Sequence, residues 1–188
     1  IRDRGITDLI IPERSQIGEG AFSGCTGITE LTILAEISIK NVAFRDCTNI
    51  VHLRIAKGTN IGGFAFNGCS GITDLNIEED VVIGQEAFLG CINITSLDIL
   101  EGSNIGEGAF TKCSGITQLN IAEGVSIGKN SFADCSAIAT LNLPKNAVIG
   151  ERAFDGCTSL ASITIPASVT SIGRAAFEDC GSLTSIVI

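Results

Sequence analysis

Apolar residues recur along the chain in a fixed order that repeats every 22 residues, with one step of 23. Each repeat contains two apolar residues that flank a polar one, as in Leu31–Ile33 and Leu53–Ile55. This alternation predicts a short β-strand whose apolar side chains point inward and whose other side chains face solvent. A second alternation, as in Ile37–Ile39, predicts another strand or extended segment on the opposite wall of each repeat.

Each repeat also contains a phenylalanine followed three residues later by a cysteine. The residue before the phenylalanine is Ala in seven repeats and Ser131 in one, and a glycine opens the segment in all repeats except the one with Lys40. A spacing of three places both side chains on one face of a single helical or 3₁₀ turn, which we expect to close each coil. The pairs are Phe22–Cys25, Phe44–Cys47, Phe66–Cys69, Phe88–Cys91, Phe110–Cys113, Phe132–Cys135, Phe154–Cys157 and Phe177–Cys180.

Self-similarity with a period of about 20 to 50 residues is typical of a solenoid, in which each unit buries its apolar face only against its neighbours. The sequence therefore predicts one α/β repeat solenoid over residues 1–188, with about eight and a half coils of 22–23 residues. We expect a parallel concave sheet and short helical or 3₁₀ turns on the convex side. With parallel strands about 4.8 Å apart, the nine concave strands expected from Leu9 to Ile186 would extend roughly 40 Å.

These columns resemble the leucine-rich repeat family, and within it the BspA-like subfamily with its Treponema-type repeat. The resemblance rests on the L-x-x-L-x-L core, as in Ile28–Ile33, and on the segment Ile17–Cys25, whose I-G-x-x-A-F-x-x-C signature recurs along the whole chain. It implies a right-handed leucine-rich-repeat superhelix. It also implies a recognition module that is secreted or exposed at the cell surface, where relatives often mediate adhesion.

Composition and charge exclude several classes of protein. The chain carries 12 Lys and Arg against 21 Asp and Glu, a net charge of -9, whereas contact with nucleic acid phosphates requires clustered cations. No apolar run approaches the roughly 18 residues of a membrane-spanning helix, so we expect no membrane insertion. Trp, Tyr and Met are absent, which removes the aromatic side chains that most often stack on sugars.

The eight cysteines belong to the repeat and do not form the close pairs of a zinc site, and His52 is the single histidine. The glycine-rich segments lack the Gly-Lys-Ser/Thr ending of a phosphate-binding loop. We therefore expect no metal and no cofactor. Stacked cysteines would have Cα atoms about 5 Å apart, within disulfide range, but their parallel Cβ directions favour a column of buried thiols over a disulfide ladder.

The outward columns of the predicted concave sheet carry all their charges in the first five strands and are neutral beyond them. Two interpretations remain open for these side chains: they compensate one another's charge, or they contact a ligand. Flanking carboxylates at Glu30 and Asp74 would favour protonated His52, so a contact through His52 should weaken as it loses its proton. The candidate ligand-binding residues are His52, Arg54, Asp74, Asn76, Glu78 and Asp98.

Catalysis is not expected, although serine, histidine and aspartate all occur on this face. Ser96 would lie two strands, roughly 10 Å, from His52 on an open surface without evident oxyanion donors. The sequence therefore predicts a non-catalytic module that binds a protein or another macromolecule.

The ends of the chain leave an alternative function open. Ser185–Ile188 would present an uncovered apolar strand, while at the other end Asp3 takes the place of a cysteine between Arg2 and Arg4. The chain is then either part of a longer array, or a structural element whose coils stack end to end into a filament or surface layer.

Overall fold

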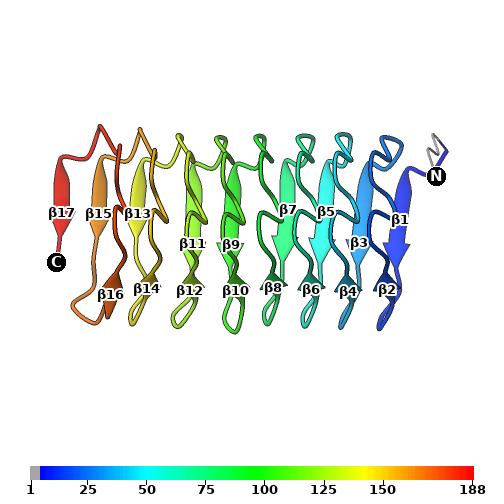
Figure 1. Ribbon diagram of the computed structural model, residues 1–188, viewed down its shortest axis with the longest axis horizontal. Coiled ribbons are helices and arrows are strands. Elements are labelled where there is room, and N and C mark those ends of the chain that lie inside the picture. The colour runs from blue at the N-terminus through cyan, green and yellow to red at the C-terminus, as the bar shows by residue number, and fades with distance from the viewer. Residues whose placement is uncertain (1–4) are drawn as a thin grey trace.

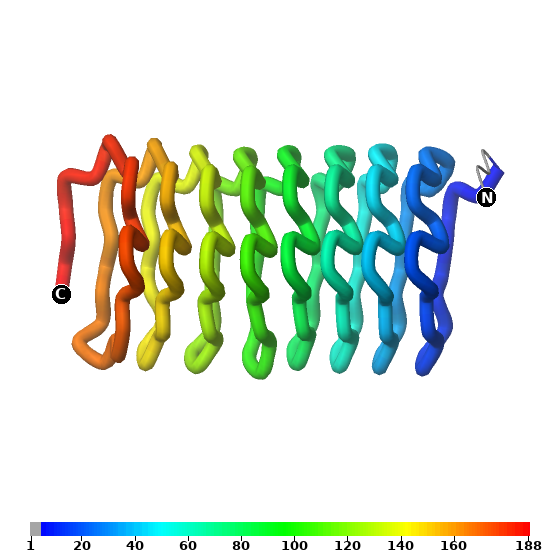
Figure 2. The backbone as a smooth tube through the Cα atoms, viewed as in Figure 1, coloured from blue at the N-terminus to red at the C-terminus, as the bar shows by residue number. Residues whose placement is uncertain are grey.

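The computed structural model describes residues 5–188, which form a row of stacked coils (Figure 1). The expected polar end at Arg2–Arg4 lies outside the described residues. Each coil runs along a wall of long strands, returns through a wall of short strands and closes through a wall of turns (Figure 2). The long strands are β1 (Asp8–Ile11), β3 (Glu30–Ile33), β5 (His52–Ile55), β7 (Asp74–Ile77), β9 (Ser96–Ile99), β11 (Gln118–Ile121), β13 (Thr140–Asn142), β15 (Ser162–Thr164) and β17 (Ser185–Val187). The short strands are β2 (Gln16–Ile17), β4 (Ser38–Ile39), β6 (Asn60–Ile61), β8 (Val82–Ile83), β10 (Asn104–Ile105), β12 (Ser126–Ile127), β14 (Val148–Ile149) and β16 (Ser171–Ile172).

All strand pairs are parallel, and paired residues are one repeat apart, as Leu31 is from Leu53. The predicted nine long strands and the predicted second strand of each coil are confirmed. The short strands form one continuous sheet, whereas the long strands divide into sheets of four, two and three, with breaks after β7 and after β11. Pro144, at the second break, is the repeat equivalent of Ala122. Ala122 donates its N–H to the Ile99 carbonyl of the preceding coil, whereas a proline has no N–H to donate.

The core is a set of columns that run the length of the stack, as the repeat predicts. The eight phenylalanines of the repeat stack ring on ring, with centroids 5.1–5.6 Å apart and nearly parallel planes. The inner six, from Phe44 to Phe154, are fully buried, and the isoleucines and leucines of both strand walls surround them. Offset stacks of this kind add to the free energy gained by burying the rings.

The expected helical or 3₁₀ turns are not formed in the described residues: the convex wall consists of turns. The residues two before and two after each phenylalanine have positive φ, as at Val42 (φ 53°) and Asp46 (φ 58°) around Phe44. A left-handed residue at the third position of a turn cannot continue into a right-handed helix. Alternate N–H groups therefore donate across to the next coil, as Phe44 does to the Ala65 carbonyl at 2.8 Å, and a third ladder of hydrogen bonds joins the coils.

The cysteine column lies beside the phenylalanine stack, and all eight cysteines are buried and outside any disulfide, as the buried-thiol interpretation predicts. Each thiol from Cys47 onward also donates a hydrogen bond to the phenylalanine carbonyl of the preceding coil, as Cys113 does to Phe88 at 3.2 Å. Burial raises the pKa of Cys113 to about 12. The thiols therefore contribute hydrogen bonds as well as apolar packing.

Candidate functional site

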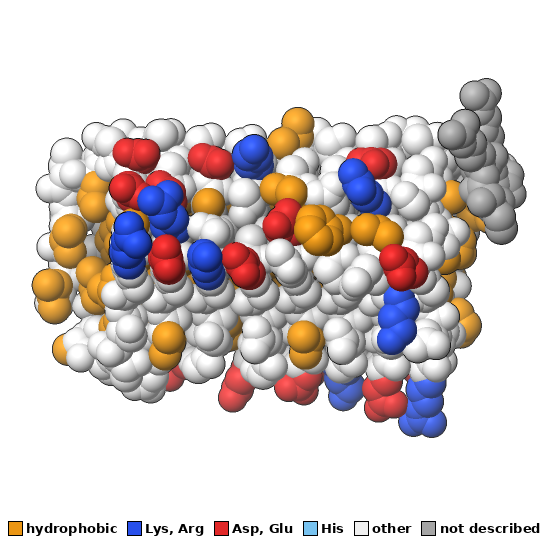
Figure 3. All heavy atoms as spheres, viewed as in Figure 1, with side chains coloured by type: hydrophobic (Ala, Val, Ile, Leu, Met, Phe, Trp, Pro, Cys, Tyr) orange, Lys and Arg blue, Asp and Glu red, His pale blue; other side chains and the backbone are white. Residues whose placement is uncertain are grey.

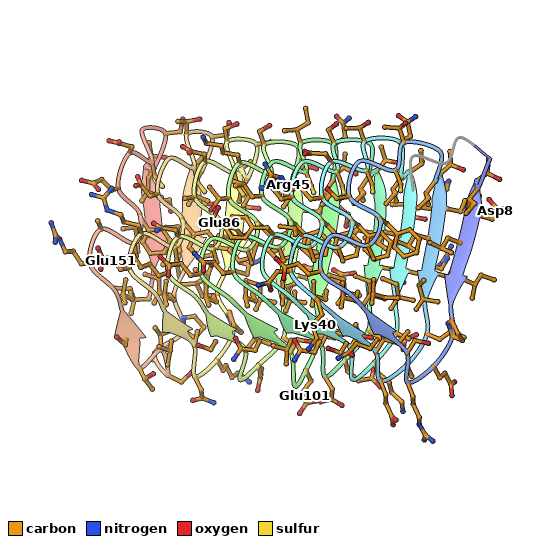
Figure 4. The ribbon with its side chains drawn as sticks, turned by 45° about the vertical axis from the view of Figure 1, so that its right-hand side comes forward. Asp8, Lys40, Arg45, Glu86, Glu101 and Glu151 are labelled. Carbon is orange, nitrogen blue, oxygen red and sulfur yellow. The ribbon has the colours of Figure 1, made fainter. Side chains whose placement is uncertain are left out.

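The outward side chains of the long strands form a surface that we call the long-strand face. Period-two alternation along each strand brings every second residue to this face while the others enter the core, as the exposed–buried pattern of β5 shows. Figure 4 shows Asp8 at the N-terminal end of this row of strands. The predicted site residues lie on three of the strands and the turn after one of them: His52 and Arg54 on β5, Asp74 and Asn76 on β7, Glu78 after β7, and Asp98 on β9.

Three of these residues form a charged cluster. In the pairing of β5 with β7, His52 lies opposite Asp74, and its Nδ1 is 3.1 Å from the Asp74 Oδ2. The same oxygen lies 3.9 Å from the Arg54 Nη2, so one carboxylate faces both an imidazole nitrogen and a guanidinium group. The three side chains remain 46%, 52% and 61% exposed for His52, Asp74 and Arg54, and they line a shallow depression together with Glu30, Leu31 and Thr32.

The other predicted residues have different partners. Asp98 accepts a hydrogen bond of 2.7 Å from the Asn120 side chain, and Glu78 accepts one of 3.0 Å from the backbone N–H of Lys57. Asn76 lies opposite Arg54 in the strand pairing. The structure therefore brings His52, Arg54 and Asp74 together, whereas Asn76, Glu78 and Asp98 form no hydrogen bond or ion pair with that cluster within residues 5–188.

The side chains that could suggest catalysis are not assembled. Within residues 5–188, Ser96 forms no hydrogen bond with His52, and Glu30 forms no ion pair with it. No group of three His, Cys, Asp or Glu side chains in that part of the chain is placed to hold a metal ion.

A second surface, which the sequence pattern did not single out, lies along the turns after the long strands. It is an open groove of about 810 Å³ lined by Glu79, Asp80, Leu100, Glu101, Gly102, Ala122, Glu123 and Gly124. A shallower extension reaches Pro144 and Pro166 and shares Ala122 and Glu123 with it. We call the whole the turn groove. Its apolar floor was visible in the sequence as the column that includes Leu100 and Ala122, but the acidic turn residues beside that column carry no repeat signature.

The parallel-strand coils, stacked phenylalanines and recurring turns define a leucine-rich repeat protein. The chain belongs to the BspA-type leucine-rich repeats: the model of the BspA type leucine rich repeat region matches residues 2–116 and 81–188. The resemblance stated from the sequence is thereby confirmed.

Two solved structures have a similar fold. One is a leucine-rich cell surface protein from Faecalibacterium prausnitzii, with 25% identity and a TM-score of 0.55, in a match covering 95% of this chain and 68% of that one. The other is the T. pallidum leucine-rich repeat protein, with 20% identity and a TM-score of 0.63, covering 97% of this chain and 79% of that one. A comparison with curated proteins found no significant match. Among the described residues, no helix has the length and apolar character needed to cross a bilayer.

Proposed function

We propose that this protein is a non-catalytic recognition module of a cell surface, which binds a protein or another macromolecule through the charged part of the long-strand face. The observation that carries the proposal is the cluster of His52, Arg54 and Asp74. These charges are exposed on a sheet whose core is complete without them, so folding does not require them.

Two further observations support this proposal. The backbone of the paired strands β5 and β7 is already ordered, so binding would cost little backbone entropy. The similar Faecalibacterium protein is described as a cell surface protein, which favours the same location for this chain. Electrostatic complementarity on such a face contributes chiefly to specificity and to the rate of association.

The test compares two double variants as baits in a pull-down from host-tissue or extracellular-matrix extract. Asp74→Asn with Asp98→Asn changes the charged half of the face, and Ser162→Ala with Thr164→Ala changes equivalent columns on the neutral strand β15. We expect the first variant to lose the captured partner and the second to retain it, with nearly unchanged thermal unfolding for both. Equal capture by both would place the binding site elsewhere.

The alternative predicted from the sequence, end-to-end assembly, has its own measurement. Sedimentation velocity over a range of protein concentrations would detect growing filaments, whereas a recognition module would sediment as a species of constant size.

A further inference from the structure

The turn groove has an apolar floor made by one column of the repeat. One residue from each of four successive coils, just after the long strand, lines the groove or its extension. These residues are Leu100, Ala122, Pro144 and Pro166. Leu100 is 39% exposed, so part of its apolar side chain is available for contact. The floor therefore offers apolar contact along several coils.

One rim of the groove is acidic. Glu79, Asp80, Glu101 and Glu123 line its main part, and no Lys or Arg lines that part. Glu123 pairs with Lys145 at 3.4 Å, whereas Glu79, Asp80 and Glu101 form no ion pair within residues 5–188. Figure 3 shows acidic side chains at the lower edge of the middle coils, with basic side chains also present along that edge toward the N-terminal side, and Glu101 is labelled at that edge in Figure 4.

The groove also lies where the hydrogen-bond ladder between coils is interrupted. Ala56, Glu78 and Ala122 donate their backbone N–H groups to the preceding coil. The N–H of Leu100, in the same column, has no acceptor among the described residues, and neither has that of Gly102, although both residues line the groove. The Leu100 donor lies at the break between β7 and β9, whereas the Gly102 donor lies in the turn that follows β9.

The shape of the groove suits an extended chain. From the turn after β7 to Pro166 the groove crosses four steps between coils, or roughly 19 Å at about 4.8 Å a step. An extended peptide advances about 3.3 Å per residue, so about six residues would fill this length. Its carbonyls could accept from the free N–H groups, and alternate side chains would point into the groove and toward the rim.

We propose that the turn groove binds an extended segment of a partner protein in which basic and apolar side chains alternate. The apolar side chains would lie on Leu100 and Ala122, and the basic ones would reach Glu79, Asp80 and Glu101. Charge complementarity selects this occupant over an acidic or neutral segment. The groove is a different surface from the long-strand face, so this inference stands apart from the proposed function.

The test uses a fluorescein-labelled peptide of four Lys-Val repeats, whose binding to the whole protein is followed by fluorescence anisotropy at low salt. We expect saturable binding, no binding of the matching Glu-Val peptide, and about tenfold weaker binding to the triple variant Glu79→Gln, Asp80→Asn, Glu101→Gln. Hydrogen exchange should show that the amides of Leu100 and Gly102 become protected when the peptide binds.

Two control variants distinguish binding in the turn groove from binding elsewhere on the protein. The triple variant Glu13→Gln, Glu19→Gln, Glu151→Gln removes the same charge outside the groove and should change the affinity less than twofold. The long-strand variant with Asp74→Asn and Asp98→Asn should bind the peptide as the unmodified protein does, so failure here is distinguishable from failure of the proposed function.

Three outcomes would overturn the proposal. Equal weakening by both triple variants would mean that the peptide responds only to net charge. Unprotected Leu100 and Gly102 amides would place the peptide elsewhere. Calorimetric binding of Ca²⁺ at the groove, without binding of the peptide, would make the acidic rim a cation site instead.

Discussion

Replacing Ser131 by alanine should make the protein more stable. Ser131 stands where the other seven repeats have Ala, and it is fully buried. Its Oγ has no hydrogen-bond partner among the described residues. A buried hydroxyl without a partner costs about 1–3 kcal/mol, because its hydration is lost and not replaced.

The site already accepts a methyl group in its neighbours, since Ala109 and Ala153 are buried at the equivalent positions one coil away on either side. Ser131→Ala therefore removes the desolvation cost and leaves a very small void. We expect the free energy of unfolding to rise by about 1–2 kcal/mol. For a chain of this length, that corresponds to an increase in Tm of about 2–8 °C.

The assay is urea unfolding followed by circular dichroism, with the reverse substitution Ala109→Ser as the matched control. The control places the same hydroxyl in an equivalent buried turn and should lower the free energy of unfolding by a similar amount. A neutral or destabilising Ser131→Ala would show that the Ser131 hydroxyl is hydrogen-bonded, and the reasoning would be refuted.

Two further predictions concern the core columns. Phe88→Ala should lower the free energy of unfolding by about 3–5 kcal/mol, because Phe88 is fully buried between two rings, and the amides of the adjoining coils should exchange first. Phe177 has one ring neighbour and is partly exposed, so Phe177→Ala should lower the free energy of unfolding less. Equal effects of the two substitutions in urea unfolding would contradict the stacked arrangement. Stability should also fall above pH 9, because Cys113 and Cys157 have pKa values of about 12 in the fold and ordinary values of 9.0 when unfolded, so the unfolded chain binds fewer protons in that window. In that window each thiol lowers the free energy of unfolding by about 1.4 kcal/mol per pH unit. Urea unfolding at pH 8, 9 and 10 should therefore show that the free energy of unfolding declines less steeply with pH in Cys113→Ala than in the unmodified protein.

The inward columns could be predicted from the sequence because their chemistry repeats without interruption. Leu53 and Ile55 enter the core since alternation fixes which face of a strand they occupy. The glycine column was equally visible, and the structure gives its reason: a Cβ at Gly62 would lie 2.7 Å from the backbone N of Asn41 in the preceding coil. Close approach of the neighbouring backbone therefore leaves no room for a side chain at Gly62.

The turn conformation could not be predicted in the same way. The left-handed position two residues before each phenylalanine is Gly20 in one coil, Val42 in the next and Phe64 in the third. Only glycine signals positive φ in a sequence, because other residues pay a steric cost there and are rarely chosen for it. Here hydrogen bonds between coils impose the conformation, and a spacing of three residues was therefore mistaken for a helical turn.

Part of the candidate site could likewise be predicted from the sequence, and part could not. Exposure of His52, Arg54 and Asp74 follows from strand alternation, and their mutual contact follows from pairing in register. The break beside Leu100 has no mark in the sequence, whereas Pro144 marks the other break by its missing N–H. The turn groove depends on both breaks and on side chains outside the repeated columns, so it became visible only in the structure.

The three ladders between coils explain how such a groove can exist in a stacked protein. A coil in a solenoid contacts only its neighbours, so a stack held by one ladder alone would divide wherever that ladder was interrupted. Between β7 and β9 the long-strand ladder is absent, yet β8 and β10 stay paired and Phe88 still donates to the Ala109 carbonyl at 2.8 Å. Two walls hold the coils together where the long-strand pairing is missing, which leaves unpaired backbone beside the turn groove for the partner that we propose.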